Sequence, residues 1–142
     1  MAHRFHLALP AGDLDDAVKF YCDLLGCSKG NSESGDSDSW VDINFWGNEL
    51  TLHASNPNQS LGGVRHEVDM GKVLVPHFGV HLSASEFAAL KQRLNDQGIS
   101  YVDEPYIRFK GSDFEQETFF ISDPAGNILE IKTMKHPDKL FD

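Results

Sequence analysis

The chain contains an internal repeat, and this repeat constrains its fold more than any other feature. The first copy opens with a short apolar strand pattern at His6 and continues through a helical pattern that ends at Gly26. The second copy opens in the same way at His77, and its helical pattern ends at Gly98. Each copy therefore predicts a strand that begins with histidine, followed by a helix that ends at a glycine.

Both helices are indicated by apolar residues at helical spacing and by residues that favour helix ends. Asp13 is a candidate N-cap of the first helix, and Ser83 and Glu86 have the spacing of a capping box in the second. Gly26 and Gly98 stand where a left-handed residue commonly ends a helix. The apolar stripes consist of Leu14, Ala17, Val18, Tyr21, Leu24 and Leu25 in the first copy and of Phe87, Leu90 and Leu94 in the second.

After each helix, the apolar pattern changes to the alternation that is typical of strands. A turn at Gly47 and Asn48 separates two such patterns in the first copy, and a turn at 123–127 separates two in the second. Each copy thus predicts the order strand–helix–strand–strand–strand, and the whole chain is predicted to be an α+β protein of paired βαβββ modules. The strands expected after the helices cover residues 31–39, 40–46 and 49–54 in the first copy and 101–110, 117–122 and 128–132 in the second.

The segment that joins the two copies contains four glycines and prolines between Pro57 and Gly71 and few periodic apolar residues. A loop of this length is uncommon in a compact domain and is often functional. We expect a single domain with module one over about 1–56, a linking loop over about 57–75 and module two over about 76–142. A linker between two modules can also lie over the site that they form.

Composition excludes several classes of function. The chain has 22 acidic and 12 basic residues, a formal net charge of −10, which disfavours nucleic acid and anionic membranes as partners. It has no apolar run near the roughly 18 residues of a membrane span, and its N-terminus lacks the apolar core of a signal peptide, so we expect a cytoplasmic protein. Cys22 and Cys27 have neither zinc nor disulfide spacing and are expected to be reduced thiols.

A candidate site follows from the matched positions of the two copies. His6 and His77 open equivalent strands, so a pseudo-twofold axis would place them symmetrically. Glu130 lies between Leu129 and Ile131, and alternation puts it on the opposite face of its strand. A buried carboxylate without a partner costs several kcal/mol, so Glu130 is either solvated or held by a cation. Two histidines and one carboxylate form the facial-triad ligand set of a divalent transition metal.

Three stretches of the sequence resemble the vicinal-oxygen-chelate superfamily, which includes glyoxalase I, extradiol ring-cleaving dioxygenases and fosfomycin-resistance transferases. They are FHLALPAGDLDDAVKFYCDLLG at 5–26, PHFGVHL at 76–82 and FFISDPAGNILEIK at 119–132. The resemblance implies open, U-shaped mixed sheets of paired βαβββ modules around a metal cleft. It also implies that His6, His77 and Glu130 are the metal ligands, and that the protein binds a small molecule. Members of the superfamily commonly form homodimers, with the site within one chain or shared across the dimer.

The fourth corner of the implied site differs from glyoxalase I. Aligning the turns of the two copies places Thr51 opposite Glu130, where glyoxalase I-like members carry a carboxylate ligand. Glu49 and His53 share the face of Thr51, and a β-bulge could bring either one into the site. A set of three protein ligands resembles the extradiol dioxygenases and the fosfomycin transferases more closely. His53 is then a candidate acid or base beside the metal, or an exposed strand histidine.

Other residues are candidates for catalysis. Alternation places Tyr106, Arg108 and Lys110 on one face, where they could orient an anionic or enolate oxygen, or form the solvated face of an edge strand. His81 follows His77 on the same face and could hydrogen-bond a bound oxygen or orient a ligand. The alternative for His81 is an ordinary histidine at a strand end.

The leading prediction is a metal-dependent, dioxygenase-like enzyme that binds a small substrate through two vicinal oxygens. Fe²⁺ suits this ligand set, and Zn²⁺, Ni²⁺ or Mn²⁺ are alternatives. His53 or His81 would transfer protons. Against ring cleavage, extradiol enzymes resemble one another in carrying a tyrosine shortly before the last glutamate ligand, where this chain has Phe120.

Two alternatives stay open. The first is a glyoxalase-like isomerase or lyase, in which Glu49 or His53 acts as the base or as the fourth ligand. The second is a non-enzymatic protein that sequesters a small molecule such as a drug. Bleomycin-resistance-like members of the superfamily do this without a catalytic metal.

Overall fold

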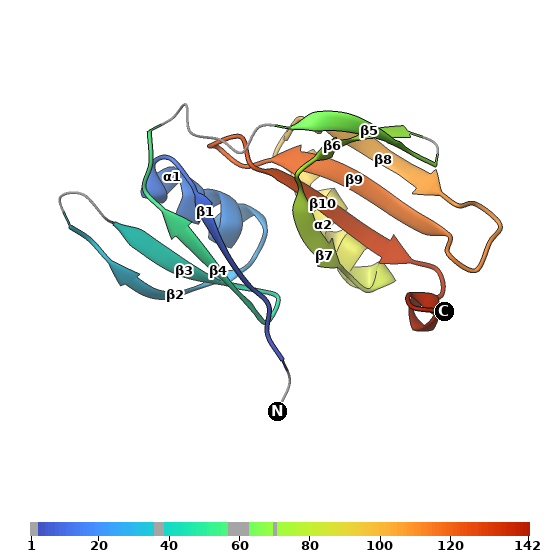
Figure 1. Ribbon diagram of the computed structural model, residues 1–142, viewed down its shortest axis with the longest axis horizontal. Helices are drawn as coiled ribbons and strands as arrows, with labels where there is room; N and C mark the ends of the chain where they lie inside the picture. The colour runs from blue at the N-terminus through green and yellow to red at the C-terminus, as the bar shows by residue number, and fades with distance from the viewer. Residues whose placement is uncertain (1–2, 36–38, 57–62, 70) are drawn as a thin grey trace. The chain divides into compact units, whose positions relative to one another are not determined.

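The chain divides into two compact units in the computed structural model, which describes residues 3–35, 39–56, 63–69 and 71–142. The first unit comprises Met1–Leu61 and Asp123–Asn127, and the second comprises Gly62–Ser122 and Ile128–Asp142. Each unit contains a four-stranded mixed sheet with a helical segment on one face (Figure 1). The predicted α+β class and the paired βαβββ modules are confirmed.

The first sheet has the strand order β1-β4-β3-β2, in which β1 and β4 are parallel and the other neighbours are antiparallel. Helix α1 (Leu14–Val18) continues directly into a π-helix (Lys19–Leu24). The buried residues of this helical segment, Ala17, Phe20 and Tyr21, belong to the core of the unit. The strands are β1 (His6–Pro10), β2 (Ser28–Glu33), β3 (Trp40–Phe45) and β4 (Asn48–His53).

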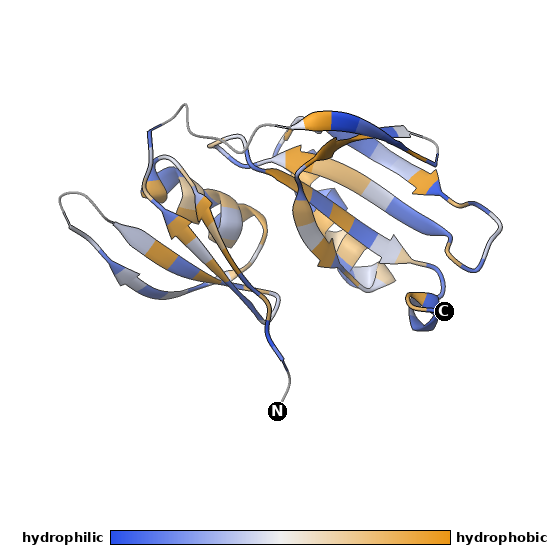
Figure 2. Ribbon diagram, in the orientation of Figure 1, coloured by the Kyte–Doolittle hydropathy of each residue, from blue (hydrophilic) through white to orange (hydrophobic). Residues whose placement is uncertain are grey.

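The second sheet repeats this order as β7-β10-β9-β8, again with one parallel pair, β7 and β10. Helix α2 (Ala84–Asp96) carries the predicted apolar stripe, whose three residues Phe87, Leu90 and Leu94 are buried. Figure 2 shows hydrophobic and hydrophilic residues alternating along strands of both sheets, β4 and β10 among them, which gives each sheet a core face and a polar face. The strands are β7 (Phe78–His81), β8 (Asp103–Arg108), β9 (Gln116–Ser122) and β10 (Ile128–Met134).

The predicted helix ends are confirmed. The Asp13 side chain accepts a hydrogen bond from the backbone N–H of Asp16 at 3.0 Å. Ser83 and Glu86 form the reciprocal capping box, with side-chain to backbone distances of 3.2 and 3.1 Å. Gly26 and Gly98 follow their helices with φ angles of 85° and 68°, a backbone conformation that glycine adopts without a steric penalty.

Strand boundaries differ from the predictions at two sheet edges. Strand β2 covers Ser28–Glu33, whereas we expected a strand over 31–39, of which 36–38 lie outside the described residues. The polar sequence of β2 carries no alternation that could mark its ends. Strand β8 ends at Arg108 instead of residue 110, because Phe109 adopts a left-handed conformation with a φ of 55°. Lys110 therefore does not continue the face of Tyr106 and Arg108, and this part of the sequence prediction is wrong.

The predicted linking loop over 57–75 is also wrong for its second half. Strands β5 (Val64–Val68) and β6 (Gly71–Val75) pair there as an antiparallel hairpin, and both belong to the second unit. Gly63 and Gly71 lie where strands β5 and β6 begin, whereas the number of glycines and prolines in the sequence suggested a loop. Residues 57–62 lie outside the described part of the chain.

The turn between β9 and β10 is held by hydrogen bonds within the first unit. The Tyr21 hydroxyl donates to Asp123 Oδ2 at 2.9 Å, and burial together with the Asp123 charge raises the pKa of Tyr21 well above 10.0. The Asn127 amide donates to the same carboxylate oxygen at 2.9 Å and to the backbone oxygen of Pro10 at 2.8 Å. Buried polar groups of this kind contribute to stability mainly because leaving one of them unpaired is costly.

Both cysteines are free thiols, as predicted, and burial raises the pKa of Cys27 to about 12. No helix in the described residues is long and apolar enough to cross a membrane.

The buried hydroxyl gives a first prediction about stability. We expect Tyr21→Phe to lower the free energy of unfolding by about 1–3 kcal/mol, because a buried carboxylate loses a hydrogen-bond donor. Tyr101→Phe is the matched control, since the Tyr101 hydroxyl donates to Asn95 on an exposed part of the surface. Urea denaturation of the two variants measures the difference, and equal effects would contradict the structural role of Tyr21.

Candidate functional site

The polar face of the second sheet gathers most of the residues that the sequence selected. Leu129 and Ile131 are fully buried on the core face of β10, so Glu130 and Lys132 lie on the other face. The registers of β7, β9 and β8 determine which of their residues share that face, because directly paired residues lie on the same side of a sheet. This polar face carries His77, His81, Tyr106, Arg108, Gln116, Thr118, Phe120, Glu130 and Lys132.

Glu130 is the central residue of this face, and its side chain is only 5% exposed. Its Oε1 lies 3.2 Å from His77 Nε2 and 3.8 Å from Lys132 Nζ. Its Oε2 accepts a hydrogen bond from the Thr118 hydroxyl at 2.6 Å and lies 3.3 Å from Arg108 Nη1. Burial alone would raise the pKa of Glu130, but the hydrogen bonds from His77 and Thr118 and the two cations outweigh it and lower the pKa to about 2.

His77 is oriented by the backbone on one side and by Glu130 on the other. Its Nδ1 lies within hydrogen-bond distance of the backbone oxygen of Leu74 in β6. Since a carbonyl oxygen only accepts, Nδ1 carries a proton, and Nε2, which faces Glu130, donates to the carboxylate when the ring is protonated. The hydrogen bond with Glu130 raises the pKa of His77, although burial opposes this.

Arg108 is buried, although the sequence allowed a solvated edge at this position. Besides its contact with Glu130, it donates a hydrogen bond from Nη2 to the Tyr106 hydroxyl at 2.6 Å. Its guanidinium also lies 6.0 Å from the centre of the Phe120 ring. Arg108 thus neutralises Glu130 directly, and the prediction that Tyr106 and Arg108 share a face is confirmed.

His81 lies at the exposed end of β7, directly paired with Lys132. Burial of part of the ring and the charge of Lys132 lower the pKa of His81.

Between His77 and His81, Gly79 packs so tightly against β10 that an added methyl group would lie 1.6 Å from the backbone oxygen of Glu130. No other amino acid fits at this position while β7 and β10 stay paired.

The first unit holds a second histidine–carboxylate pair. His6 Nδ1 lies 2.7 Å from Glu49 Oε1, and both side chains are more than half exposed. Thr51 pairs with Ala8 as Glu130 pairs with Gly79, which confirms that Thr51 and Glu130 are equivalent positions.

The other candidates at this corner lie further from His6 along the strands. The Thr51 hydroxyl donates to Asp42 Oδ1 at 2.7 Å. His53 is exposed at the end of β4, paired with Trp40. Of the three residues that the sequence proposed here, Glu49 is therefore the one that contacts His6.

The structure thus brings together two of the three predicted metal ligands, His77 and Glu130, and places His6 in the other unit. In the described ranges of the chain, no group of three or more histidine, cysteine, aspartate or glutamate residues is arranged to hold a metal ion. Thr118 and Lys132, which contact Glu130, were missed by the sequence reasoning. The alternation of β10 indicated the face of Lys132, but only the strand register shows that Thr118 lies opposite it.

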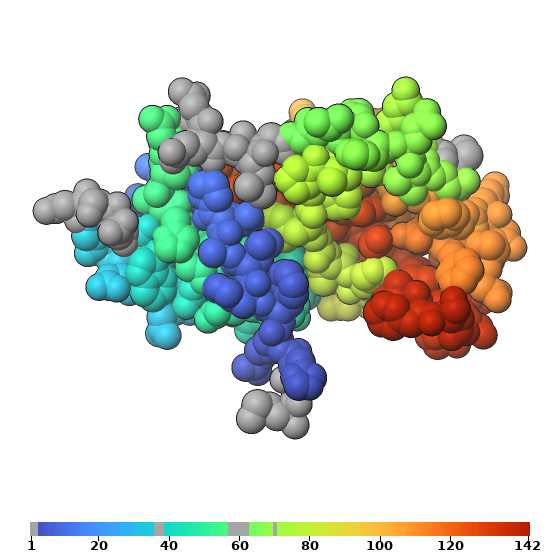
Figure 3. All heavy atoms as spheres, in the orientation of Figure 1, coloured from blue at the N-terminus to red at the C-terminus, as the bar shows by residue number. Residues whose placement is uncertain are grey.

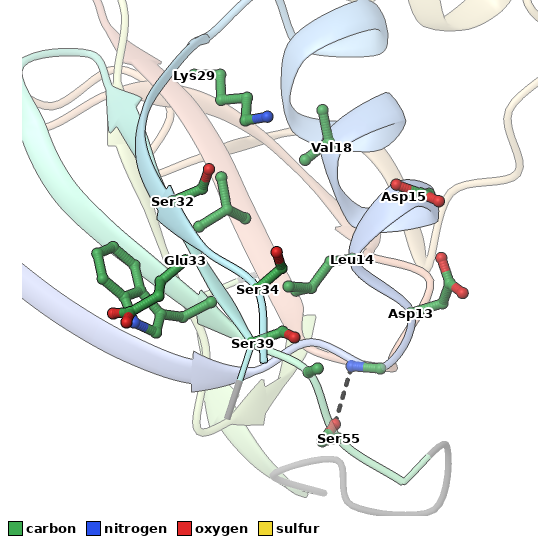
Figure 4. Close-up of a pocket in the computed structure, with 14 residues that line it drawn as sticks. Asp13, Leu14, Asp15, Val18, Lys29, Ser32, Glu33, Ser34, Ser39 and Ser55 are labelled. Atoms are coloured by element: carbon green, nitrogen blue, oxygen red, sulfur yellow. Dashed lines mark hydrogen bonds between the residues drawn. The ribbon is translucent and has the colours of Figure 1, made fainter. Parts of the chain in front are cut away.

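The first unit has a pocket of its own. It is formed between α1 and strands β2 and β3, with Leu14 and Val18 among its apolar residues (Figure 4). Serine and acidic side chains, among them Ser39 and Asp13, also line it, together with Lys29. None of the predicted site residues lines this pocket.

Comparisons with known proteins decide the family. Residues 4–131 match the Glyoxalase/Bleomycin resistance protein/Dioxygenase superfamily. The chain belongs to this superfamily. The solved structures that resemble the chain have the fold of this superfamily. Among curated proteins, no sequence matches the chain.

Three similar structures illustrate the range of the superfamily. A glyoxalase/bleomycin resistance protein/dioxygenase from Alicyclobacillus acidocaldarius is 32% identical, with a TM-score of 0.73 over 99% of this chain and 96% of that one. TnmS3, an antibiotic binding protein from Streptomyces, is 20% identical, with a TM-score of 0.59 over 95% and 98%. The fosfomycin resistance protein FosX from Listeria monocytogenes is 10% identical, with a TM-score of 0.66 over 99% and 98%. The last two likenesses concern the fold alone.

The low pKa of Glu130 gives a prediction about acid stability. The pKa of Glu130 is about 2 in the folded protein and about 4.5 without the fold. The ionised carboxylate therefore stabilises the folded protein fully above pH 4.5, and this contribution is lost as the pH falls towards 2. We expect the unfolding free energy of Glu130→Gln to depend less on pH between about 4.5 and 2 than that of the wild type. Both are measured in the presence of a metal chelator. Glu104→Gln, which changes an exposed residue of β8, is the control. Parallel pH profiles for wild type and Glu130→Gln would contradict the ion pairing described here.

Proposed function

We propose that the protein is a metal-dependent enzyme that binds a divalent ion through His77, Glu130 and His6 and acts on a small anionic molecule. The observation that carries this proposal is the pair of His77 Nε2 and Glu130 Oε1, which face each other at 3.2 Å. The other polar atom of each side chain already has a partner. These two atoms contact each other, and a divalent ion that took the place of this contact would bind to both.

The chemistry of the donors fits such an ion. Imidazole nitrogen and carboxylate oxygen suit Fe²⁺, Zn²⁺, Ni²⁺ and Mn²⁺, among which Fe²⁺ is our first choice. A ligating histidine almost always donates its other N–H to a fixed acceptor, as His77 does to Leu74. Two donors are too few for a stable site, and the sequence repeat assigns the third to His6. His6 would come from the same chain or from a second copy in a homodimer.

A bound divalent ion would supply Lewis acidity, which polarises a substrate oxygen and stabilises its anionic form. The side chains around Glu130 suit an anionic substrate. Lys132 is 26% exposed and lies on the Oε1 side of Glu130, where its positive charge attracts an anionic oxygen. Arg108 contacts both Glu130 and Tyr106, so we assign it to holding Glu130 in place.

Proton transfer falls to the histidines beside the ligands. His81 has a lowered pKa and is therefore neutral near pH 7, so it is able to accept a proton from a substrate held next to Lys132. His53, on the polar face of the first sheet, remains the second candidate acid or base. Tyr106 keeps its own hydroxyl proton while it accepts from Arg108, so it is able to donate to a substrate oxygen.

The dioxygenase-like reaction is our first choice because the fourth corner of the site holds Thr51 instead of a carboxylate. The Thr51 hydroxyl donates a hydrogen bond to Asp42, so we do not assign it as a ligand. Three protein ligands leave positions for two vicinal substrate oxygens and O₂. The contact of Glu49 with His6 favours a second candidate, a glyoxalase-like isomerase or lyase with four protein ligands. The direct neutralisation of Glu130 by Arg108 favours the third, a metal-free protein that sequesters a small molecule.

Metal binding is tested first. Protein prepared without oxygen is titrated with Fe²⁺, Mn²⁺, Zn²⁺ and Ni²⁺ by calorimetry, and its metal content is measured by mass spectrometry. We expect one equivalent per chain, and binding weaker by a factor of 100 or more in His77→Ala, since one of few ligands is lost. His136→Ala, a histidine of the C-terminal segment, is the control. Equal metal content in wild type and His77→Ala would overturn the proposal.

The role of Glu49 separates the two enzyme candidates. With three protein ligands, Glu49→Gln keeps the metal affinity within a factor of about 3, and the iron-loaded protein consumes O₂ with catechols. With four ligands, the same variant loses 10-fold or more of the affinity, and the nickel- or zinc-loaded protein turns over α-ketoaldehydes without O₂ uptake. If metal-free protein binds the catechol or the α-ketoaldehyde as tightly as metal-loaded protein does, the result favours the sequestering protein.

A further inference from the structure

The hairpin of β5 and β6 lies outside the repeated βαβββ plan, and it is fastened to the second sheet at two places. Arg65 Nη1 lies 3.1 Å from both carboxylate oxygens of Asp103 at the start of β8. Asp69, at the tip of the hairpin, accepts a hydrogen bond from the backbone N–H of Phe109 at 2.8 Å, just beyond the end of β8. Figure 3 shows the atoms of the hairpin, in green, beside those of β8, in orange.

Strand β6 contacts both ends of a chain of polar side chains. The chain runs from His77 to Glu130, from Glu130 to Arg108, and from Arg108 to Tyr106. At its first end, the backbone oxygen of Leu74 in β6 holds His77 Nδ1. At its last end, Tyr106 packs against the backbone of Gly71, also in β6.

Gly71 leaves the space that Tyr106 occupies. A methyl group on Gly71 would lie 3.2 Å from the Tyr106 hydroxyl oxygen, 3.4 Å from Cζ and 3.5 Å from Cε2. A larger side chain would push the phenol aside. The Tyr106 hydroxyl is the acceptor for Arg108 Nη2, so its displacement would be transmitted to the guanidinium.

Arg108 has few other attachments. Its Nε is buried and has no hydrogen-bond partner in the part of the chain that the structure describes. Among the described residues, Glu130 and Tyr106 are therefore the two that hold its guanidinium by an ion pair and a hydrogen bond. A shift of Tyr106 would loosen Arg108 and, with it, Oε2 of Glu130.

We propose that β6 is a positioning element of the site, and that Gly71 sets the place of the Glu130 carboxylate through Tyr106 and Arg108. Gly71 touches neither metal nor substrate in this account, and it acts only through the phenol. The inference rests on the proposed metal binding at His77 and Glu130. It adds a determinant of that site in a segment that neither βαβββ module contains.

Co²⁺ is the probe for the test, because its visible absorption reports the arrangement of its ligands. Wild type, Gly71→Ala, Gly71→Val and Tyr106→Phe are titrated with Co²⁺, and affinity and the spectrum at saturation are recorded with the melting temperature. We expect Gly71→Val to bind Co²⁺ about 10-fold more weakly or worse, with a changed spectrum, as is usual when a residue that orients a ligand is lost. Gly71→Ala should show a smaller effect in the same direction.

The double variant Gly71→Ala/Tyr106→Phe tests the route. Without the hydroxyl, the methyl group has more room, so Gly71→Ala should have little further effect on Co²⁺ affinity in the Tyr106→Phe background. Gly35→Ala is the control, since a methyl group there meets nothing within 4 Å. Should Gly71→Val fail to fold, Gly71→Ala and the double variant still decide the question.

Failure of this inference is distinguishable from failure of the proposed function. If Co²⁺ binding is lost in His77→Ala but is unchanged in both Gly71 variants, the positioning role of β6 is overturned and the metal site stands. Equal losses from Gly71→Ala with and without the Tyr106 hydroxyl overturn the route through Tyr106. If Co²⁺ binding does not depend on His77, both proposals are overturned.

Discussion

The second sheet is organised around the buried charge of Glu130. A carboxylate that is removed from water costs several kcal/mol unless nearby groups compensate it. Here a guanidinium, an ammonium group, an imidazole and a hydroxyl approach its two oxygens, and the result is a pKa of about 2. These partners come from four different strands or strand ends, so the position of each strand is coupled to the same carboxylate.

The two modules share a topology and differ in the chemistry of their polar faces. At the position of the buried Glu130, the first sheet has Thr51, which forms a neutral–charged hydrogen bond with Asp42. The charged pair of the first sheet, His6 and Glu49, is more than half exposed instead, and solvent screens it. The two modules thus differ in that the second contains a buried, charge-compensated carboxylate and the first an exposed histidine–carboxylate pair. In our proposal, the second unit supplies two of the metal ligands and the first unit supplies the third.

The sequence predicted what depends on local pattern. The helix caps at Asp13 and Ser83, the paired modules and the face of Glu130 all follow from residue type and period, and the structure agrees with them. The hairpin was missed because its strands are five residues each, largely exposed, and interrupted by residues that resemble a loop. The burial of Arg108 was missed for a related reason, since it depends on contacts with Glu130 and Tyr106 that register and hairpin placement create. The third ligand of our proposal, His6, belongs to the other unit, and no local pattern tests that assignment.

Diffraction from crystals grown with Zn²⁺ tests the central claim most directly, because the anomalous signal locates the ion without assumptions about the reaction. The account predicts one strong peak per chain, about 2.0–2.2 Å from both His77 Nε2 and Glu130 Oε1, with His6 as the third protein ligand. Ions bound only elsewhere, with Glu130 still paired to His77 and Arg108, would contradict it.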